Sequence, residues 1–234
     1  MFLAEMFGVM VLILLGDGVV ANVVLNKTKG QNSGWIVITA GWAFAVFCGA
    51  MTSIALGGPG SLNPAGDIAS IVTGGDPTTA MLNIAGQFVG AFIGAVLVWL
   101  SYIDHFKETP DGPSKLAVFS TGPAIRNPIS NLMTEIIATF ALIFIVNMIL
   151  KVLSGGNQPF NPYFVGILIW SLGLSLGGPT GYALNPARDL GPRIAHFVLP
   201  IPNKGDSDWG YAWIPVVGPI IGAVLGAVLF NALV

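Results

Sequence analysis

One tripeptide, asparagine-proline-alanine, occurs twice in the chain, as Asn63, Pro64 and Ala65 and again as Asn185, Pro186 and Ala187. Asparagine is a favoured helix N-cap and proline suits the first helical position, so each copy predicts the start of a helix. A helix start carries partial positive charge, and the asparagine amide can donate hydrogen bonds. Two such starts brought to one place would disfavour cations, including hydronium, and would offer donors to a hydroxyl or water oxygen.

The residues before each tripeptide are rich in glycine and proline. Leu-Gly-Gly-Pro opens both segments, and two residues separate it from Leu-Asn-Pro-Ala in the first copy and four in the second. This backbone cannot be helical, and such backbone is tolerated at membrane depth where it lines a wet cavity. Its free carbonyls would form a row of acceptors, which we expect from Gly60, Ser61, Leu62, Gly181, Tyr182 and Ala183.

Three acidic residues interrupt otherwise apolar stretches, and an acid inside a membrane segment is a functional-site hypothesis. Glu5 and Glu135 hold matching places in the two halves of the chain, whereas Asp17 has no such twin and receives no role. Arg188 follows directly on the second tripeptide and would bring a fixed fork of donors there. Gln87 is interpreted as a polar packing residue.

The composition indicates that lipid surrounds the elements that carry these residues. Of 234 residues, 54% are hydrophobic and only 9% are charged, and the mean hydropathy is +0.79. A bilayer span needs about 20 mostly apolar residues. The predicted spans are 1–25, 35–56, 78–103, 128–150, 163–176 with its apolar flanks, and 209–234. Segments 63–72 and 185–198 are too short to span and predict half-helices.

The chain reads as one domain made of two repeats, about 1–103 and 128–234, joined by a connecting loop of about 104–127. Three spans per repeat is an odd number, so the repeats must sit in opposite orientations in the membrane. Two glycine ladders match between the repeats: Gly86, Gly90 and Gly94, then Gly218, Gly222 and Gly226. Small residues at this spacing let helices pack closely.

Several function classes find no support in the residues. A net charge of −2 gives no basic surface for nucleic acid. No Cys, His and carboxylate cluster has metal-ligand spacing, no nucleophile–base pair indicates an enzyme, and no cofactor is implied. Cys48 is read as an apolar core residue, and His105 and His196 as loop or interface residues. The N-terminal stretch is read as a first span rather than a signal peptide.

The two tripeptides, the six spans and the inverted repeat resemble the aquaporin and aquaglyceroporin family over essentially the whole chain. Residues 181–193 are similar to the second motif of glycerol facilitators. The resemblance implies an all-α, right-handed bundle of six transmembrane helices plus two half-helices. It also implies a multi-pass protein of the plasma membrane, with both termini in the cytoplasm, that assembles as a homotetramer. Glu5 and Glu135 would then brace the irregular loops, the alternative being proton relay.

The family's narrowest constriction falls on Trp42, Gly173, Tyr182 and Arg188. Arg188 would donate to hydroxyl oxygens, and Trp42 with Tyr182 would form an apolar corner for carbon atoms. Gly173 leaves room where water-selective members typically carry histidine. Four further positions of the chain also resemble the glycerol branch of the family: Tyr102, Asp189, Arg193 and Pro215.

The chain departs from the family's pattern around the first tripeptide. The family usually has histidine where Ser61 stands, and a valine-threonine pair where Gly66 and Asp67 stand. Asp67 complements the helix dipole, and it could weaken the positive barrier. Passage of neutral lactic acid beside glycerol is therefore left open.

We therefore predict a passive channel that conducts glycerol and other small neutral solutes with some water, and excludes ions and protons. The alternatives are a water-selective aquaporin and an ion-coupled secondary transporter, which also uses inverted repeats and broken helices. The family orientation puts only Lys151 on cytoplasmic connections, which runs against the positive-inside rule.

Overall fold

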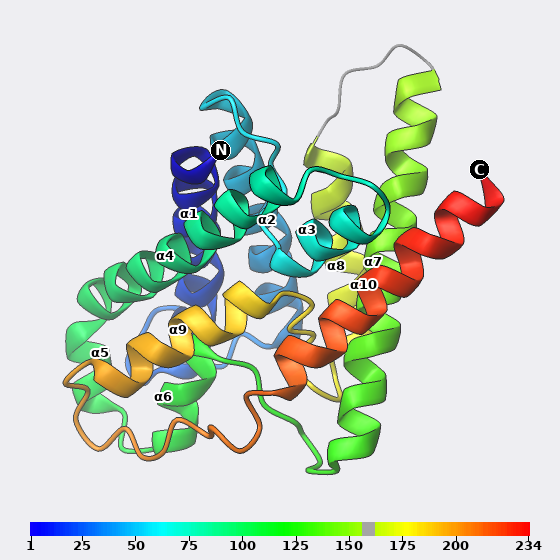
Figure 1. Cartoon of the computed structure of the whole chain (residues 1–234). Helices are drawn as coiled ribbons and strands as arrows, with labels where there is room; N and C mark the ends of the chain where they lie inside the picture. The colour runs from blue at the N-terminus through cyan, green and yellow to red at the C-terminus, as the bar shows by residue number, and fades with distance from the viewer. Residues whose placement is uncertain (156–161) are drawn as a thin grey trace.

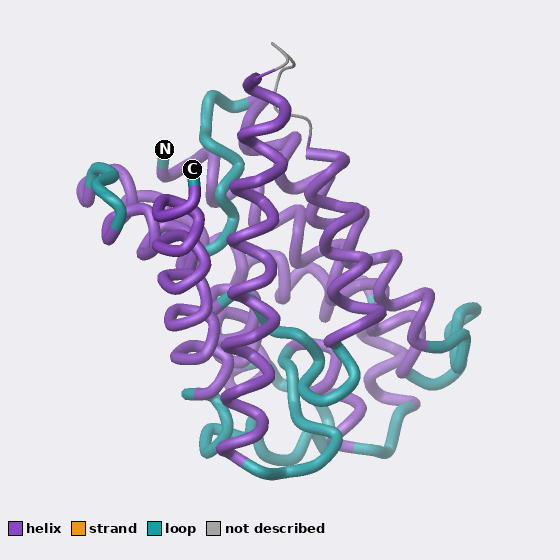
Figure 2. Tube along the Cα trace, turned by 90° about the vertical axis from the view of Figure 1, so that its right-hand side faces the viewer, coloured by secondary structure: helices purple, strands orange, loops and turns teal. Residues whose placement is uncertain are grey.

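The structure, a computed structural model, describes residues 1–155 and 162–234, and over these residues it contains helices and connections but no strand (Figures 1 and 2). The predicted second repeat therefore includes six residues, 156–161, that lie outside the described part of the chain. The helices are α1 (Phe2–Val24), α2 (Trp35–Ala55), α3 (Pro64–Val72), α4 (Pro77–Ser101), α5 (Ile103–Glu108), α6 (Gly112–Phe119), α7 (Pro128–Gly155), α8 (Pro162–Leu176), α9 (Pro186–Val198) and α10 (Ile214–Leu233).

Five helices, α1, α2, α4, α7 and α10, are long and apolar enough to cross a membrane, and α8 is a shorter apolar helix of 15 residues. Their exposed surface is apolar, as at Ile36, Met81 and Ile129, which are 66%, 59% and 78% exposed. In water such a surface would drive aggregation, whereas lipid is a suitable solvent for it. α3 and α9 match the predicted half-helices, with 9 and 13 residues.

Two boundaries differ from the sequence prediction. The last span does not begin at 209, because Tyr211 N and Ala212 N bond to the carbonyls three residues earlier and form turns before α10. Pro215, near the first position of α10, suits a helix start rather than an interior. The segment predicted as a connecting loop contains α5 and α6, which lie together at one end of the bundle, whereas both termini lie at the other (Figure 1).

The glycine ladders bring the helices of each repeat into backbone contact. A Cβ atom at Gly90 of α4 would overlap the Met6 carbonyl of α1, and one at Gly222 of α10 would overlap the Ile136 carbonyl of α7. Glycine is needed at these places because any side chain would force the helices apart. The pairs α1–α4 and α7–α10 are thus equivalent, and they fix the two repeats to the same internal geometry.

The half-helices pack across the repeats, and this places their starts inside the bundle. α3 contacts α10, and α9 contacts α4. α2 and α8 also contact one another, with α1 beside α2 and α7 beside α8. Each half-helix therefore begins deep in the protein, between helices of both repeats, and runs outward from there (Figure 1).

Candidate functional site

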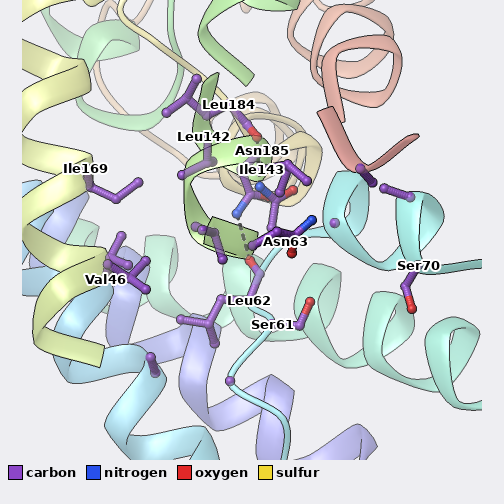
Figure 3. Close-up of a pocket in the computed structure, with 18 of the residues that line it drawn as sticks. Val46, Ser61, Leu62, Asn63, Ser70, Leu142, Ile143, Ile169, Leu184 and Asn185 are labelled. Atoms are coloured by element: carbon purple, nitrogen blue, oxygen red, sulfur yellow. Dashed lines mark hydrogen bonds between the residues drawn. The ribbon is translucent and has the colours of Figure 1, made fainter. Parts of the chain in front are cut away.

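Asn63 and Asn185 cap the half-helices and bond to each other's loops. Asn63 Oδ1 accepts from Ala65 N at 2.9 Å, and Asn185 Oδ1 accepts from Ala187 N at 3.0 Å and from Arg188 N at 3.2 Å. The amide nitrogens point across the molecule, where Asn63 donates to the Leu184 carbonyl at 2.8 Å and Asn185 to the Leu62 carbonyl at 2.7 Å (Figure 3). Because an amide carries two donor hydrogens, each asparagine keeps one beyond this bond.

The residue before each asparagine has an uncommon backbone conformation. Leu62 has φ 56° and Leu184 has φ 58°, in the left-handed region that side chains disfavour. A residue held there costs about 1–3 kcal/mol, so the surrounding structure must fix it. Their matched values show that the two loops follow the same path into the two half-helices.

Two buried glutamates hold these backbones. Glu5 accepts hydrogen bonds from Ser61 N at 3.1 Å and Leu62 N at 2.7 Å, and its fully buried carboxylate also accepts from the Ser53 hydroxyl at 2.6 Å. Glu135 makes the equivalent set, with Ala183 N at 3.0 Å, Leu184 N at 3.1 Å and the Thr180 hydroxyl at 2.6 Å.

Gln87 does more than the packing role predicted for it, because its side chain joins two acids. Its Nε2 atom donates to Glu5 Oε2 at 2.7 Å and to Asp67 Oδ2 at 2.7 Å. Asn83 donates to the other Asp67 oxygen at 3.0 Å. Two side-chain amides thus hold the Asp67 carboxylate. No cation lies within ion-pair distance of this carboxylate among the described residues.

A cavity of about 590 Å³ runs past both asparagines and is lined by residues of both repeats (Figure 3). Apolar side chains such as Leu12, Val46 and Ile169 form much of its wall. Nine of the predicted site residues line it: Trp42, Gly60, Ser61, Leu62, Asn63, Tyr182, Ala183, Asn185 and Arg188. The remaining predicted carbonyl, that of Gly181, is not part of this lining, and Leu184 lines it instead. The proline and alanine of each tripeptide form the half-helix starts behind the asparagines.

The four residues predicted to form the constriction come together in the structure. The Arg188 guanidinium carbon lies 4.0 Å from the centre of the Trp42 ring, and its Nη1 atom donates to the Phe119 carbonyl at 3.3 Å. Tyr182 lies beside Gly173, where a Cβ atom would stand 2.8 Å from the Tyr182 ring carbon Cζ. A flat cation and two aromatic rings thus share one part of the cavity wall, and Gly173, which is not part of the lining, lies against Tyr182.

The structure adds Trp35 and Asp17 to this group, neither of which was predicted to belong there. Trp35 Nε1 donates to the Gly173 carbonyl at 3.0 Å, and its ring meets Tyr182 edge to face at 5.9 Å. Asp17 on α1 lies 3.7 Å from Arg188 Nη1 and is fully buried. An acid within an apolar span signals a functional position, but the partner of Asp17 could not be read from the sequence.

Asp189 and Arg193 form a buried ion pair that fixes the loop near Arg188. Their side chains are 2.8 Å apart and fully buried, and Asp189 also accepts from Thr121 N at 2.8 Å. Arg193 donates to the carbonyls of Ser207 and Thr121 at 2.7 and 3.0 Å. The other two glycerol-branch positions lie elsewhere: Tyr102 caps the C-terminus of α4, with its ring 5.8 Å from that of His105, and Pro215 is the second residue of α10.

Comparisons with known proteins agree over the whole chain. The family model of the major intrinsic protein matches residues 1–230. The "Probable glycerol uptake facilitator protein" of Thermotoga maritima is 54% identical, covering 99% of this chain and 98% of its own. "Glycerol uptake facilitator protein 3" of Lactiplantibacillus plantarum is 50% identical, covering 99% and 95%.

The solved structures confirm the predicted aquaporin-like fold. The X-ray structure of the aquaglyceroporin from Plasmodium falciparum superposes with a TM-score of 0.83 at 28% identity, over 98% of this chain and 94% of that one. Sequence, helix arrangement and capping geometry therefore lead to one assignment. The chain belongs to the major intrinsic protein family.

Proposed function

We propose that this protein is a passive channel that conducts glycerol and other small neutral solutes, together with some water. The observation that carries the proposal is the pairing of Arg188 with an apolar corner. The guanidinium lies over the Trp42 ring in the cavity wall, and Tyr182 lies against Gly173. A polyol has one face of hydroxyls and one of carbons, and this arrangement matches both. The names of the relatives, glycerol uptake facilitators, support the same substrate.

Hydrogen bonds along the cavity would replace those that the solute makes with water. The spare donors of Arg188, Asn63 and Asn185 suit hydroxyl oxygens. The backbone carbonyls that line the cavity suit hydroxyl hydrogens. Apolar side chains opposite them offer no partner, so a hydroxyl is oriented in one direction as it moves.

Ion exclusion is proposed to come from the two helix starts. α3 and α9 both begin beside the cavity, so their partial positive charges add where Asn63 and Asn185 meet. A cation there would also lose its water without an anionic ligand in exchange. Glu5 and Glu135 are proposed to brace the loops rather than to relay protons, because their oxygens already accept bonds from loop amides and hydroxyls.

The residues around Gly66 support a broader solute range that includes neutral lactic acid. A Cβ atom at Gly66 would meet nothing closer than 3.7 Å, the distance to Ile143 Cδ1, so the chain leaves space there. Ser61 contributes a small hydroxyl to the same wall. Uptake of lactic acid that rises as the external pH falls toward the acid's own pKa would support this part of the proposal, and uptake independent of pH would reject it.

Light scattering of proteoliposomes after rapid mixing tests the main proposal. Wild type and Tyr182→Ala are compared for glycerol and water permeability with no ion gradient. Rapid glycerol entry with a low activation energy supports a passive polyol pore, and a changed solute preference in the variant supports Tyr182 as part of its constriction. Water flux without glycerol flux would indicate a water-selective channel. Flux that needs a proton or sodium gradient would indicate a coupled transporter.

We also propose the cell membrane location, the orientation and the assembly that the family implies: both termini in the cytoplasm, and four subunits with one pore each. A single cysteine added at the C-terminus of a Cys48→Ser protein tests the orientation, because a membrane-impermeant thiol reagent added to intact cells should leave it unlabelled. Labelling from outside would show that the orientation is the opposite of the one proposed.

Native mass spectrometry in detergent tests the assembly. It should give four times the mass of one chain, and the mass of a single chain would reject the tetramer.

A further inference from the structure

Asp17 is a buried acid that the proposed conduction mechanism does not yet use. Its side chain is fully buried in the largely apolar helix α1, and neither carboxylate oxygen has a hydrogen-bond partner among the described residues. A buried carboxylate without compensation is strongly unfavourable. The only cation within 4.0 Å of it in the described part of the chain is Arg188, at 3.7 Å.

The guanidinium of Arg188 is held between three groups. One face lies over Trp42, Nη1 donates to the Phe119 carbonyl, and the same nitrogen is the one nearest to Asp17. Gly16 permits this approach, because a Cβ atom there would overlap the Trp42 ring. α1 therefore presents a bare backbone to Trp42 and a carboxylate to the arginine from two consecutive positions.

The internal repeat provides a comparison within the same molecule. Glu5 corresponds to Glu135, and the same offset relates Met6 to Ile136. The Met6 carbonyl faces Gly90, and the Ile136 carbonyl faces the equivalent glycine, Gly222. At this offset Asp17 corresponds to Asn147, which lines the cavity.

Counted from each asparagine, Arg188 in turn corresponds to Gly66. Of the two equivalent sites, one pairs Arg188 of the second repeat with Asp17 of the first, and the other combines Gly66 with Asn147 and has neither charge. The acid occurs where the arginine needs a counter-charge.

We infer that Asp17 is a specificity-determining residue that neutralises Arg188, so that the constriction offers hydrogen-bond donors without net positive charge. The inference rests on the proposed function, in which Arg188 faces the conducted solute. An uncompensated arginine in a low-dielectric cavity would attract and retain small anions. With Asp17 behind it, the guanidinium still donates to the oxygen of a neutral solute, while a chloride or carboxylate ion gains little by entering.

Chloride entry into liposomes, read from quenching of an entrapped dye, tests this charge balance directly. Asp17→Asn keeps the shape of the side chain and removes its charge, and we expect chloride entry to rise about tenfold over wild type. Asp17→Glu keeps the charge and should stay at the wild-type rate. Asp104→Asn makes the same change at a side chain that is 82% exposed and does not line the cavity, and it should also leave chloride entry unchanged. Equal chloride entry in wild type and Asp17→Asn would overturn the inference.

The double variant Asp17→Asn with Arg188→Gln separates charge from shape. It removes both charges, so chloride entry should return to the wild-type rate, and a rate as high as in Asp17→Asn alone would overturn the inference.

Thermal melting in detergent adds a readout that needs no flux. Arg188→Gln alone leaves a buried carboxylate without its cation, so it should melt below the double variant, and the reverse order would overturn the pairing. Absence of glycerol flux in wild type would reject the proposed function, whereas these charge measurements would still be decisive for Asp17.

Discussion

The side-chain amide of Asn63 donates a 2.8 Å hydrogen bond to the backbone carbonyl of Leu184, 121 residues later in the chain. Asn185 returns an equivalent bond to Leu62, so each asparagine caps its own half-helix and holds the opposite loop. The two helix starts cannot separate without breaking both bonds. This mutual hold fixes the width of the cavity at the point where the two positive helix ends face one another.

Replacement of Asn63 by aspartate should weaken this hold. The Asn63→Asp side chain keeps the acceptor for Ala65 N, but it turns an acceptor toward the Leu184 carbonyl, which also accepts. We expect a loss of about 1–3 kcal/mol in unfolding free energy and a cation leak, because a negative charge replaces a donor beside the helix starts. Denaturation in detergent and sodium flux in liposomes measure these effects. Asn22→Asp is the control, since Asn22 uses its side-chain oxygen to accept from Gly30 N, and aspartate retains that bond.

The two glutamates should differ in how well they tolerate replacement by glutamine. Glu5 receives two donors on each carboxylate oxygen, whereas Glu135 receives two on Oε1 and one on Oε2. A glutamine keeps one oxygen, so Glu5→Gln leaves two donors unpaired and Glu135→Gln leaves one. At about 1–3 kcal/mol for each unpaired donor, Glu5→Gln should melt at the lower temperature. Equal melting with loss of a proton-driven flux would instead favour the relay role.

The fold could be predicted from the sequence because its determinants are local or repeated. Asn63 and Pro64 define a helix start by themselves, and α3 begins at Pro64 as expected. The equivalent start at Pro186 follows from the repeated tripeptide. Glycines spaced by four residues predicted close helix packing, and both ladders lie against neighbouring backbone. Such features need no knowledge of which distant residues meet.

The parts of the site that could not be predicted depend on distant pairings. Asp17 gave a clear signal as an acid in an apolar helix, but its partner Arg188 belongs to the other repeat and shares no sequence pattern with it. The sequence predicts only a packing role for Gln87, because an amide side chain in a span does not indicate which residue it will bond. In the structure it lies between Glu5 and Asp67, and it donates to both. Pairings of this kind become visible only once the helices are placed.

The glycine ladder should tolerate no side chain, in contrast with the glycine next to the first tripeptide. Gly90→Ala places a methyl group into the Met6 carbonyl of α1, so α1 and α4 must separate. We expect a loss of about 1–3 kcal/mol or failure to fold, because overpacking cannot be relieved against backbone. Gly66→Ala is the control, since its methyl group meets nothing nearer than 3.7 Å. Thermal melting of both variants decides, and similar melting temperatures would show that α4 can shift without cost.

Gly173 should set the solute size that the constriction admits. A methyl group in Gly173→Ala would stand 2.8 Å from Tyr182 Cζ and 2.9 Å from the Thr39 methyl carbon, so the tyrosine ring must move toward the cavity. We expect glycerol permeability to fall several-fold, while water permeability changes less because water needs a narrower passage. Gly178→Ala is the matched control on the same stretch of chain, because nothing lies within 4 Å of its added carbon. The ratio of glycerol to water permeability in proteoliposomes measures the effect. An unchanged ratio in Gly173→Ala, with normal melting, would place the size limit elsewhere in the cavity.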